Sequence, residues 1–186
     1  YLRGINTLMQ FKEKCDHFNV EEIKGIGTSA LRDASNSQDF IDEVLKVCGI
    51  QIEIVTGLRE AKLIYEGVKW SYRFIEPAVI MDIGGGSTEF IFADRNGIYD
   101  MISLNIGVSR IQQYFLSSDP LTTTNIKDIE DWLEDKSDGF FDGKEEHILI
   151  GASGSFETFY ELIHKILLKN RFHMLSLTLL TYHLLL

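Results

Sequence analysis

The stretch MDIGGGSTEF, residues 81–90, places carboxylates on both sides of three consecutive glycines and a Ser-Thr pair. Glycines can adopt positive φ values and let backbone N–H groups approach an anion closely. Asp82 suits a Mg2+ ion or its water molecules, which would screen the charge of a phosphate. The predicted phosphate-binding turn consists of Gly84, Gly85, Gly86 and Ser87. A glycine hairpin without a ligand remains the alternative, because so short a motif is weakly specific.

A second small-residue segment, GASGS at 151–155, lies between an apolar run and a segment of helical periodicity. The N-terminus of a helix that follows a strand directly is favourable for binding anions. The candidate phosphate-binding residues are Gly151, Ser153, Gly154 and Ser155. The alternative is an ordinary helix cap supplied by one of the two serines.

The segment GTSALRD at 27–33 supplies further candidate phosphate ligands. Thr28 and Ser29 directly follow a predicted strand, and the guanidinium of Arg32 could donate two hydrogen bonds to a phosphate. Arg32 could equally be half of a surface ion pair.

The segment TGLREAKLIYEG at 56–67 places Glu60 in the first turn of a predicted helix that enters from the opposite lobe. A carboxylate in this position could face the bound phosphate. The alternative is a capping arrangement in which Gly57 is the N-cap and Glu60 occupies the third helical position.

Alternating helical and strand periodicity in the first part of the chain predicts the elements that position these residues. The predicted helices are 2–15, 35–49 and 58–70, and the predicted strands are 20–27, 50–57 and 78–83. Pro77 precedes the last of these strands, and we place a domain boundary near residue 76.

In the second part, strands at 87–94 and 98–107 are expected to pair antiparallel with the strand at 78–83, as a meander whose first turn is GGGS. The remaining predicted elements are helices at 108–116, 125–136 and 156–169 and a strand at 147–152. The Leu-rich segment 174–186 is interpreted as a buried helix. This order predicts an α/β protein with two lobes that meet near the glycine-rich turns.

Composition excludes several classes of function. The formal net charge of -10 argues against a general nucleic-acid binder, which would normally present a basic face. No apolar segment reaches the roughly 20 residues of a membrane span. Cys15 and Cys48 lack metal-ligand spacing, and the N-terminal residues lack the core of a signal peptide, so we expect a reducing, cytoplasmic setting.

Five segments occur in the order that is typical of the exopolyphosphatase/guanosine pentaphosphate phosphatase (Ppx/GppA) family. They are GTSALRDASNSQDF, IEIVTGLREAKLIYEGV, MDIGGGSTEF, LNIGVSR and GASGS. The resemblance implies an incomplete two-lobed actin-like (ribonuclease H-like) α/β fold with mixed sheets and flanking helices. Residues 1–76 would form the C-terminal part of the first lobe, and residues 77–186 a truncated second lobe.

The resemblance implies Mg2+-dependent hydrolysis of terminal phosphate from inorganic polyphosphate. Glu60 matches the general base for the attacking water, Asp82 and Glu89 match the acidic pair near metal and water, and Arg32 matches a phosphate-contacting arginine. Two alternatives remain open, a guanosine pentaphosphate 5'-phosphohydrolase and a non-catalytic phosphate-ligand sensor or scaffold. Neither a nucleic acid nor a membrane is an expected partner, and the resemblance suggests a homodimer.

The chain departs from the family pattern in one respect. Family members normally begin with a further strand and a glycine-serine phosphate turn that carries a metal-binding aspartate, and these 186 residues contain no such motif. We therefore expect residues 1–186, expressed alone, to be unstable and inactive.

Overall fold

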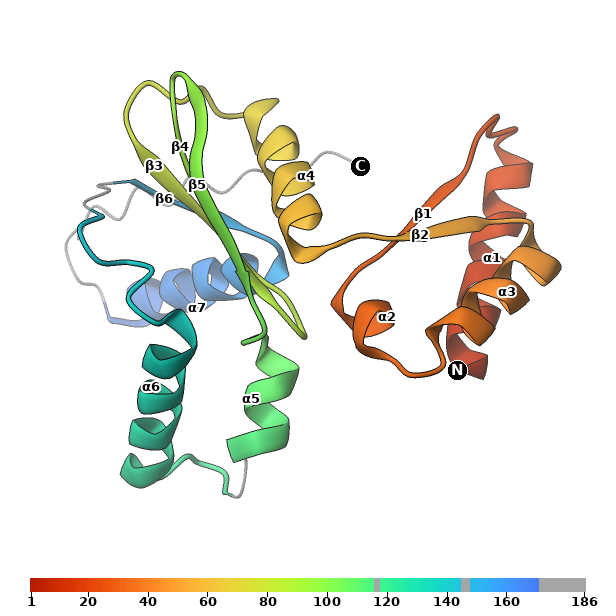
Figure 1. Ribbon diagram of the computed structural model, residues 1–186. Helices are drawn as coiled ribbons and strands as arrows, with labels where there is room; N and C mark the ends of the chain where they lie inside the picture. The colour runs from red at the N-terminus through yellow and green to blue at the C-terminus, as the bar shows by residue number, and fades with distance from the viewer. Residues whose placement is uncertain (116–117, 145–147, 171–186) are drawn as a thin grey trace. The chain divides into compact units, whose positions relative to one another are not determined.

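The computed structural model describes residues 1–115, 118–144 and 148–170, the last six of these as backbone only (Figure 1). The helix predicted at 174–186 lies outside the described residues. Contacts divide the chain into two units, Tyr1–Thr56 and Gly57–Leu186, and each is considered by itself. Within the described residues, no helix is long and apolar enough to cross a lipid bilayer.

The first unit is a two-stranded parallel sheet with three helices. Its elements are α1 (Leu2–His17), β1 (Lys24–Gly27), α2 (Ser29–Asp33), α3 (Ser37–Cys48) and β2 (Gln51–Ile54). Its core contains Ile5 of α1, Val44 and Cys48 of α3, and Ile50 next to β2. The helix α3 ends where the sequence predicts, because Gly49 adopts the left-handed conformation with φ 67°.

The second unit is built around a four-stranded mixed sheet. Its elements are α4 (Gly57–Lys69), β3 (Ala78–Ile83), β4 (Thr88–Asp94), β5 (Gly97–Leu104), α5 (Val108–Phe115), α6 (Thr123–Ser137), β6 (Ile148–Ala152) and α7 (Gly154–Asn170). The strand order is β5-β4-β3-β6, with antiparallel pairs along β3, β4 and β5 and a parallel pair between β3 and β6. The predicted meander and the mixed α/β fold class are confirmed.

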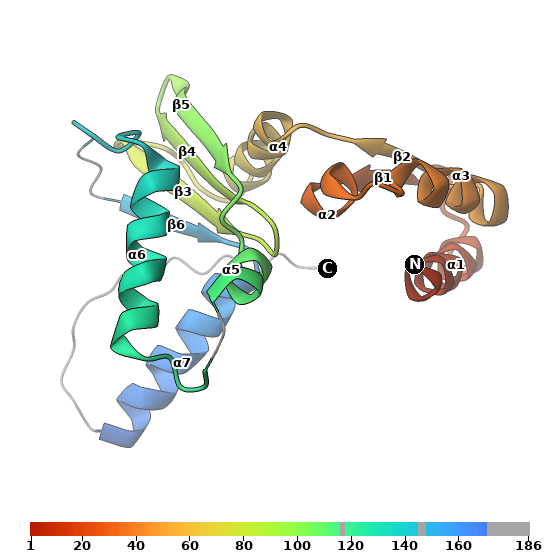
Figure 2. The same cartoon turned by 60° about the horizontal axis from the view of Figure 1, so that its bottom comes forward.

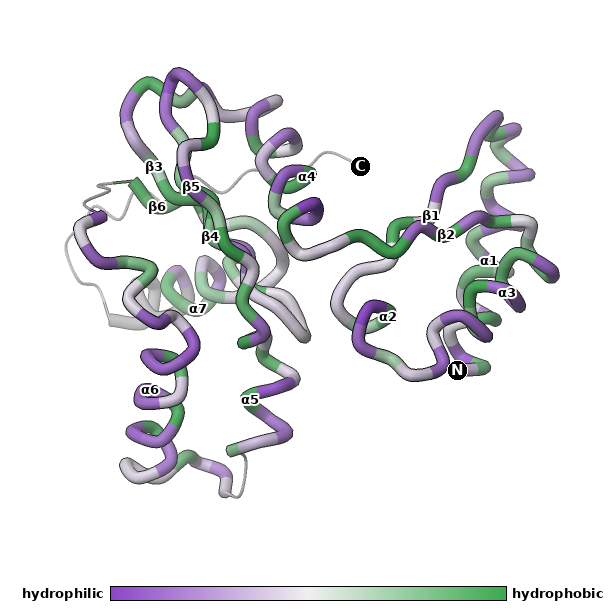
Figure 3. The backbone as a smooth tube through the Cα atoms, in the orientation of Figure 1, coloured by the Kyte–Doolittle hydropathy of each residue, from purple (hydrophilic) through white to green (hydrophobic). Residues whose placement is uncertain are grey.

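One face of this sheet packs against α4. Ile80 of β3 lies opposite Ile91 of β4, and both are fully buried in a cluster with Ala61 and Tyr65 of α4. Because alternate residues of a strand share a face, Asp82 and Glu89 must lie on this face too, at the end where β3 and β4 meet. In Figure 3, β3 is mostly coloured as hydrophobic and α6 mostly as hydrophilic.

The opposite face of the sheet receives the start of α7. Gly151 of β6 pairs with Met81, one residue out of phase with Ile80, so it faces away from α4. A side chain at Gly151 would collide with the ring of Phe156, which is buried at the start of α7. Figure 2 shows α4 and α7 on different sides of the sheet. The two helices therefore cover its two faces.

The division into units differs from the boundary expected near residue 76. It falls after Thr56, because the apolar face of α4 packs on the sheet of the second unit. The assignment of 1–76 and 77–186 to two lobes of a complete protein stays a prediction. The short helix α2 was not predicted, because its residues were described only as following a strand.

Candidate functional site

The glycine-rich stretch forms the tight turn between β3 and β4. Asp82 pairs with Glu89 and Ile83 with Thr88, so the turn itself spans Gly84 to Ser87. It is closed by a hydrogen bond of 2.9 Å from the N–H of Gly84 to the carbonyl oxygen of Ser87. The turn thus brings the two carboxylates of the motif next to each other on one face of the sheet.

The start of α5 holds the carbonyl groups of this turn. Each of the three glycine carbonyls accepts a hydrogen bond from that helix. The donor and acceptor pairs are Val108 N to Gly84 O (3.0 Å), Ser109 N to Gly85 O (2.8 Å) and Arg110 Nε to Gly86 O (2.6 Å). All three carbonyls are therefore directed toward α5.

The direction of these carbonyls determines where the N–H groups of the turn point. In a planar trans peptide the C=O and N–H bonds point in opposite directions. The peptide N–H groups of Gly85, Gly86 and Ser87 share their planes with the three held carbonyls, so they point away from α5. Several N–H groups that face one side form a concavity suited to an anion. The turn is therefore an organised set of donors.

Gly107 makes this arrangement possible by its lack of a side chain. A Cβ atom at this position would lie 2.4 Å from the carbonyl carbon and oxygen of Gly85 and from the nitrogen of Gly86. Only glycine allows the two backbone segments to approach so closely. Gly107 belongs to the segment LNIGVSR, but its role could not be predicted from the sequence, because only the tertiary contact reveals it.

Glu89 is the buried carboxylate of the site. Its residue is 1% exposed, and its Oε1 atom accepts a hydrogen bond of 2.6 Å from the hydroxyl of Ser103 on the neighbouring strand. Burial raises the pKa of Glu89, the hydroxyls of Ser103 and Ser87 oppose the shift, and the negative charges of Glu60 and Asp82 add to it. The charges of Glu60 and Asp82 therefore both act on Glu89.

Asp82 lies at the carboxyl end of β3 and is half-buried. Burial raises the pKa of Asp82 above its ordinary value, and a hydrogen bond from the side chain of Ser153 opposes that shift. The hydroxyl of Ser155 donates to the carbonyl oxygen of Ile83 at 2.8 Å, and the hydroxyl oxygen of Ser153 lies 3.3 Å from the same carbonyl oxygen. The GASGS segment thus meets the glycine turn at the end of β3.

The residues of GASGS differ in what they can offer a ligand. Gly151 lies within β6, where its lack of a side chain makes room for Phe156. Gly154 is exposed at the first position of α7, and the space where its Cβ would lie is open. Packing therefore accounts for Gly151, and the predicted phosphate contacts of all four residues stay predictions.

Glu60 lies in the first turn of α4, one residue before the fully buried Ala61. We expected this helix to belong to the opposite lobe, but its contacts group it with the sheet that carries Asp82 and Glu89. The influence of Glu60 on the pKa of Glu89 places its charge in the neighbourhood of the turn. Its predicted role as a base stays a prediction.

The three candidates of the first unit have local roles there. Arg32 donates from Nη1 to the carbonyl oxygen of Val55 at 2.9 Å, and the hydroxyl of the buried Ser29 donates to Asp33 at 3.2 Å. Thr28 precedes α2 as its N-cap residue, without a side-chain cap hydrogen bond. Phosphate binding by Thr28, Ser29 and Arg32 stays a prediction.

The carboxylates near the turn are the candidate ligands for the implied Mg2+ ion. In the described part of the chain, no three His, Cys, Asp or Glu residues are grouped so that they alone could hold a metal. Mg2+ does not require such a group, because it commonly binds one or two carboxylates together with water and substrate phosphate. The half-buried Asp82 fits this role, whereas Glu89 already accepts hydrogen bonds from two serines.

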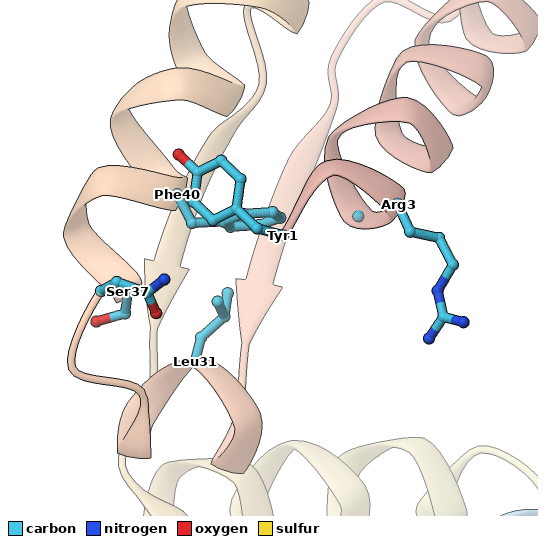
Figure 4. A pocket seen from close by; sticks show the side chains of 7 residues that line it. Tyr1, Arg3, Leu31, Ser37 and Phe40 are labelled. Atoms are coloured by element: carbon cyan, nitrogen blue, oxygen red, sulfur yellow. The ribbon is translucent and has the colours of Figure 1, made fainter.

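The described residues also include two pockets that are lined by other residues. The first, of about 330 Å³, is lined in part by Tyr1, Leu31, Ser37 and Phe40. Figure 4 shows Tyr1 beside Phe40, with Arg3 pointing away from both. The second, of about 430 Å³, lies between the end of α4 and the β4–β5 turn. Neither contains a predicted site residue.

Replacing Glu89 with glutamine is expected to raise the melting temperature of the metal-free full-length protein at neutral pH. The pKa of Glu89 is raised above its ordinary value of 4.5, so the folded state binds more protons than the unfolded state between these two pKa values. The ionised carboxylate therefore opposes folding at neutral pH, and glutamine removes that cost. Well below pH 4.5 the carboxyl is neutral in both states, so the gain should disappear.

Thermal unfolding in EDTA, followed from neutral to acid pH, measures this effect. The exposed Glu66→Gln on α4 is the matched control and should behave as the parent. A Glu89→Gln protein that melts below the parent by the same margin at every pH would show that the buried charge carries no such cost.

Comparison with known proteins identifies the relatives of this chain. Residues 1–175 match the Ppx/GppA phosphatase family. The chain is 34% identical over 164 residues to a bifunctional 3-dehydroquinate synthase/phosphatase of Fusobacterium nucleatum, which covers 84% of the chain and 25% of that protein. It is 36% identical over 105 residues to a guanosine-5'-triphosphate,3'-diphosphate pyrophosphatase of Aeromonas hydrophila, which covers 56% of the chain and 21% of that protein.

Solved structures agree with the fold. An exopolyphosphatase from Cytophaga hutchinsonii superimposes with a TM-score of 0.83 at 31% identity, over 92% of this chain and 55% of that one. A Ppx/GppA family member from Aquifex aeolicus gives a TM-score of 0.71 at 29% identity, over 88% of this chain and 53% of that one. The chain thus spans about half the length of these structures and a quarter or less of the curated relatives.

Proposed function

Because this chain belongs to the Ppx/GppA phosphatase family, we propose that the protein hydrolyses the terminal phosphoric anhydride of inorganic polyphosphate. The observation that carries the proposal is the glycine turn, whose three carbonyls are held by α5 so that three N–H groups face one side. Phosphoryl transfer requires positioned donors for the phosphate oxygens and a group that orients the attacking water. The turn supplies the donors, and the neighbouring carboxylates can supply the group that orients the water.

In the proposed mechanism, the N–H groups of Gly85, Gly86 and Ser87 bind oxygens of the terminal phosphate. Glu60 orients the attacking water and accepts its proton as the general base. The start of α7 at Gly154 and the serines beside it provide further donors. The residues of the first unit, Thr28, Ser29 and Arg32, are proposed to bind phosphate oxygens as well.

Asp82 is proposed to hold Mg2+, which would neutralise charge on the phosphate oxygens when it is bound. Glu89 lies opposite Asp82 on the neighbouring strand and accepts a hydrogen bond from the hydroxyl of Ser103. We propose that Glu89 adds negative charge to the metal side of the site and helps to orient water. Burial raises the pKa of both carboxylates, and a bound cation would favour their ionised forms.

A second candidate substrate is guanosine pentaphosphate, because the name of the Aeromonas relative describes an enzyme that acts on a guanosine phosphate. The reaction would be the same, with a nucleoside phosphate in place of the polyphosphate chain. A non-catalytic phosphate sensor is the alternative of a different class. It would bind both ligands and hydrolyse neither.

The test is to incubate the full-length protein with each substrate and to measure orthophosphate release with Mg2+ and with EDTA. We expect Mg2+-dependent release, faster from polyphosphate than from guanosine pentaphosphate. Faster release from guanosine pentaphosphate would assign the second substrate. Binding without release from either would assign the sensor.

The proposed setting is the cytoplasm, and the proposed assembly is a homodimer. Both proposals rest on the composition and on the family resemblance. No nucleic-acid partner is proposed, because the net charge of -10 opposes binding to a phosphate backbone. Light scattering of the full-length protein would determine the assembly.

A further inference from the structure

We propose that Arg110 is a positioning residue, whose guanidinium holds the glycine turn so that its N–H groups face the phosphate. The inference rests on the proposed function and names a residue that acts through the turn. Arg110 is the third residue of α5 and is half-buried. Its Nε atom donates to the carbonyl oxygen of Gly86 at 2.6 Å.

The effect of Arg110 on a ligand follows from the geometry of one peptide group. The carbonyl of Gly86 and the N–H of Ser87 belong to the same planar unit. When Nε fixes the direction of the carbonyl, it also fixes the direction of the N–H on the other side. Arg110 therefore determines the direction of the Ser87 N–H, although it contacts the opposite side of the peptide.

Arg110 differs from the other two anchors of the turn. The bonds to Gly84 and Gly85 come from backbone N–H groups of α5, which almost any residue could supply. The bond to Gly86 comes from a side chain, so it depends on the identity of the residue. It is also charge-assisted, and such hydrogen bonds are shorter and stronger than neutral ones. The positive charge polarises the peptide and makes the N–H of Ser87 a better donor.

The remaining anchors should preserve the fold when Arg110 is changed. The turn keeps its closing hydrogen bond, its two backbone bonds to α5 and its close contact with Gly107. Loss of the Nε bond should therefore loosen the turn without dismantling it. Small errors in the placement of reacting groups reduce turnover strongly, and we expect kcat/KM of Arg110→Met to fall about 10- to 100-fold.

The experiment compares Arg110→Met and Arg110→Lys with the parent in the full-length protein, by kcat, KM and melting temperature. Lysine keeps the charge and one donor, so its activity should lie between the parent and methionine. Most of the loss should appear in kcat, because the donors matter most when charge moves onto the phosphate oxygens. The matched control is Arg95→Met, the same change at an exposed arginine in the β4–β5 turn.

Several results would overturn the proposal. Parent values of kcat and KM in Arg110→Met would do so, and so would an equal loss in Arg95→Met, which would indicate a general effect of charge. If Arg110→Met does not fold, Arg110→Lys decides, with reduced kcat at an unchanged melting temperature as the supporting result. A lowered melting temperature with parent kcat would assign a merely structural role.

A binding measurement separates this inference from the proposed function. If the parent protein hydrolyses neither substrate, titration with pyrophosphate by calorimetry tests Arg110 without catalysis. We then expect weaker binding in Arg110→Met than in Arg95→Met and in the parent. Equal binding in all three proteins, or no binding in the parent, would contradict the positioning role.

Discussion

Replacing Glu60 with glutamine in the full-length protein is expected to lower kcat on its phosphate substrate by about 10²- to 10⁴-fold, the usual contribution of a general base. Glutamine keeps the size of the side chain and can still orient water, but it cannot accept a proton. KM should change little, because the phosphate donors of the glycine turn remain. The expectation follows from the position of Glu60 at the start of α4, where its charge influences Glu89.

The matched control for this variant is Glu66→Gln, further along the same helix. Glu66 is exposed and its carboxylate lies 3.9 Å from Nζ of Lys69. An exposed ion pair of this kind contributes little to stability, so the control should keep the kinetic constants of the parent. A Glu60→Gln protein that is as active as Glu66→Gln would exclude Glu60 as the base.

Replacing Gly107 with alanine is expected to abolish most of the activity and to destabilise the protein. The new Cβ would lie 2.4 Å from three atoms of the Gly85–Gly86 peptide, which is backbone and cannot rotate out of the way. Overpacking of this kind costs about 1–3 kcal/mol in stability. The turn must move to accommodate it, and we expect kcat/KM to fall at least about 100-fold, because the phosphate donors move with it.

Gly67→Ala is a control that should change the stability in the opposite direction. Gly67 lies within α4, and the space around its missing Cβ is open. Alanine is favoured over glycine inside a helix by roughly 0.5–1 kcal/mol, so this variant should melt at or above the parent and keep its activity. Kinetic measurements and thermal unfolding of both variants test the pair. Parent activity in Gly107→Ala would show that the close contact does not shape the site.

The elements of the fold could be predicted well where local pattern and tertiary role agree. The apolar run 78–83 and the alternation after the glycines predict a hairpin, and β3 and β4 are observed there. The helix α2 was missed, because five residues are too few for a periodic signal. The boundary near residue 76 differs from the observed division, because the packing of α4 depends on a sheet formed later in the chain.

The candidate site could be predicted only in part. Asp82 and Glu89 flank the glycine turn in the sequence, so their proximity follows from the hairpin itself. Ser103 and Arg110 lie 14 and 24 residues from their partners, and short motifs contain no information about such contacts. From the sequence, Gly107 is noticeable only as part of the family segment LNIGVSR. These supporting residues of the site could therefore be identified only from the three-dimensional structure.

We propose that these residues bind a phosphate end and direct water to its terminal phosphorus. The most direct test is hydrolysis by the full-length protein with Mg2+ in water enriched in oxygen-18, followed by mass analysis of the products. We predict that the released orthophosphate carries the label and that the shortened substrate does not. Label in the shortened substrate, or no orthophosphate from either polyphosphate or guanosine pentaphosphate, would contradict the claim.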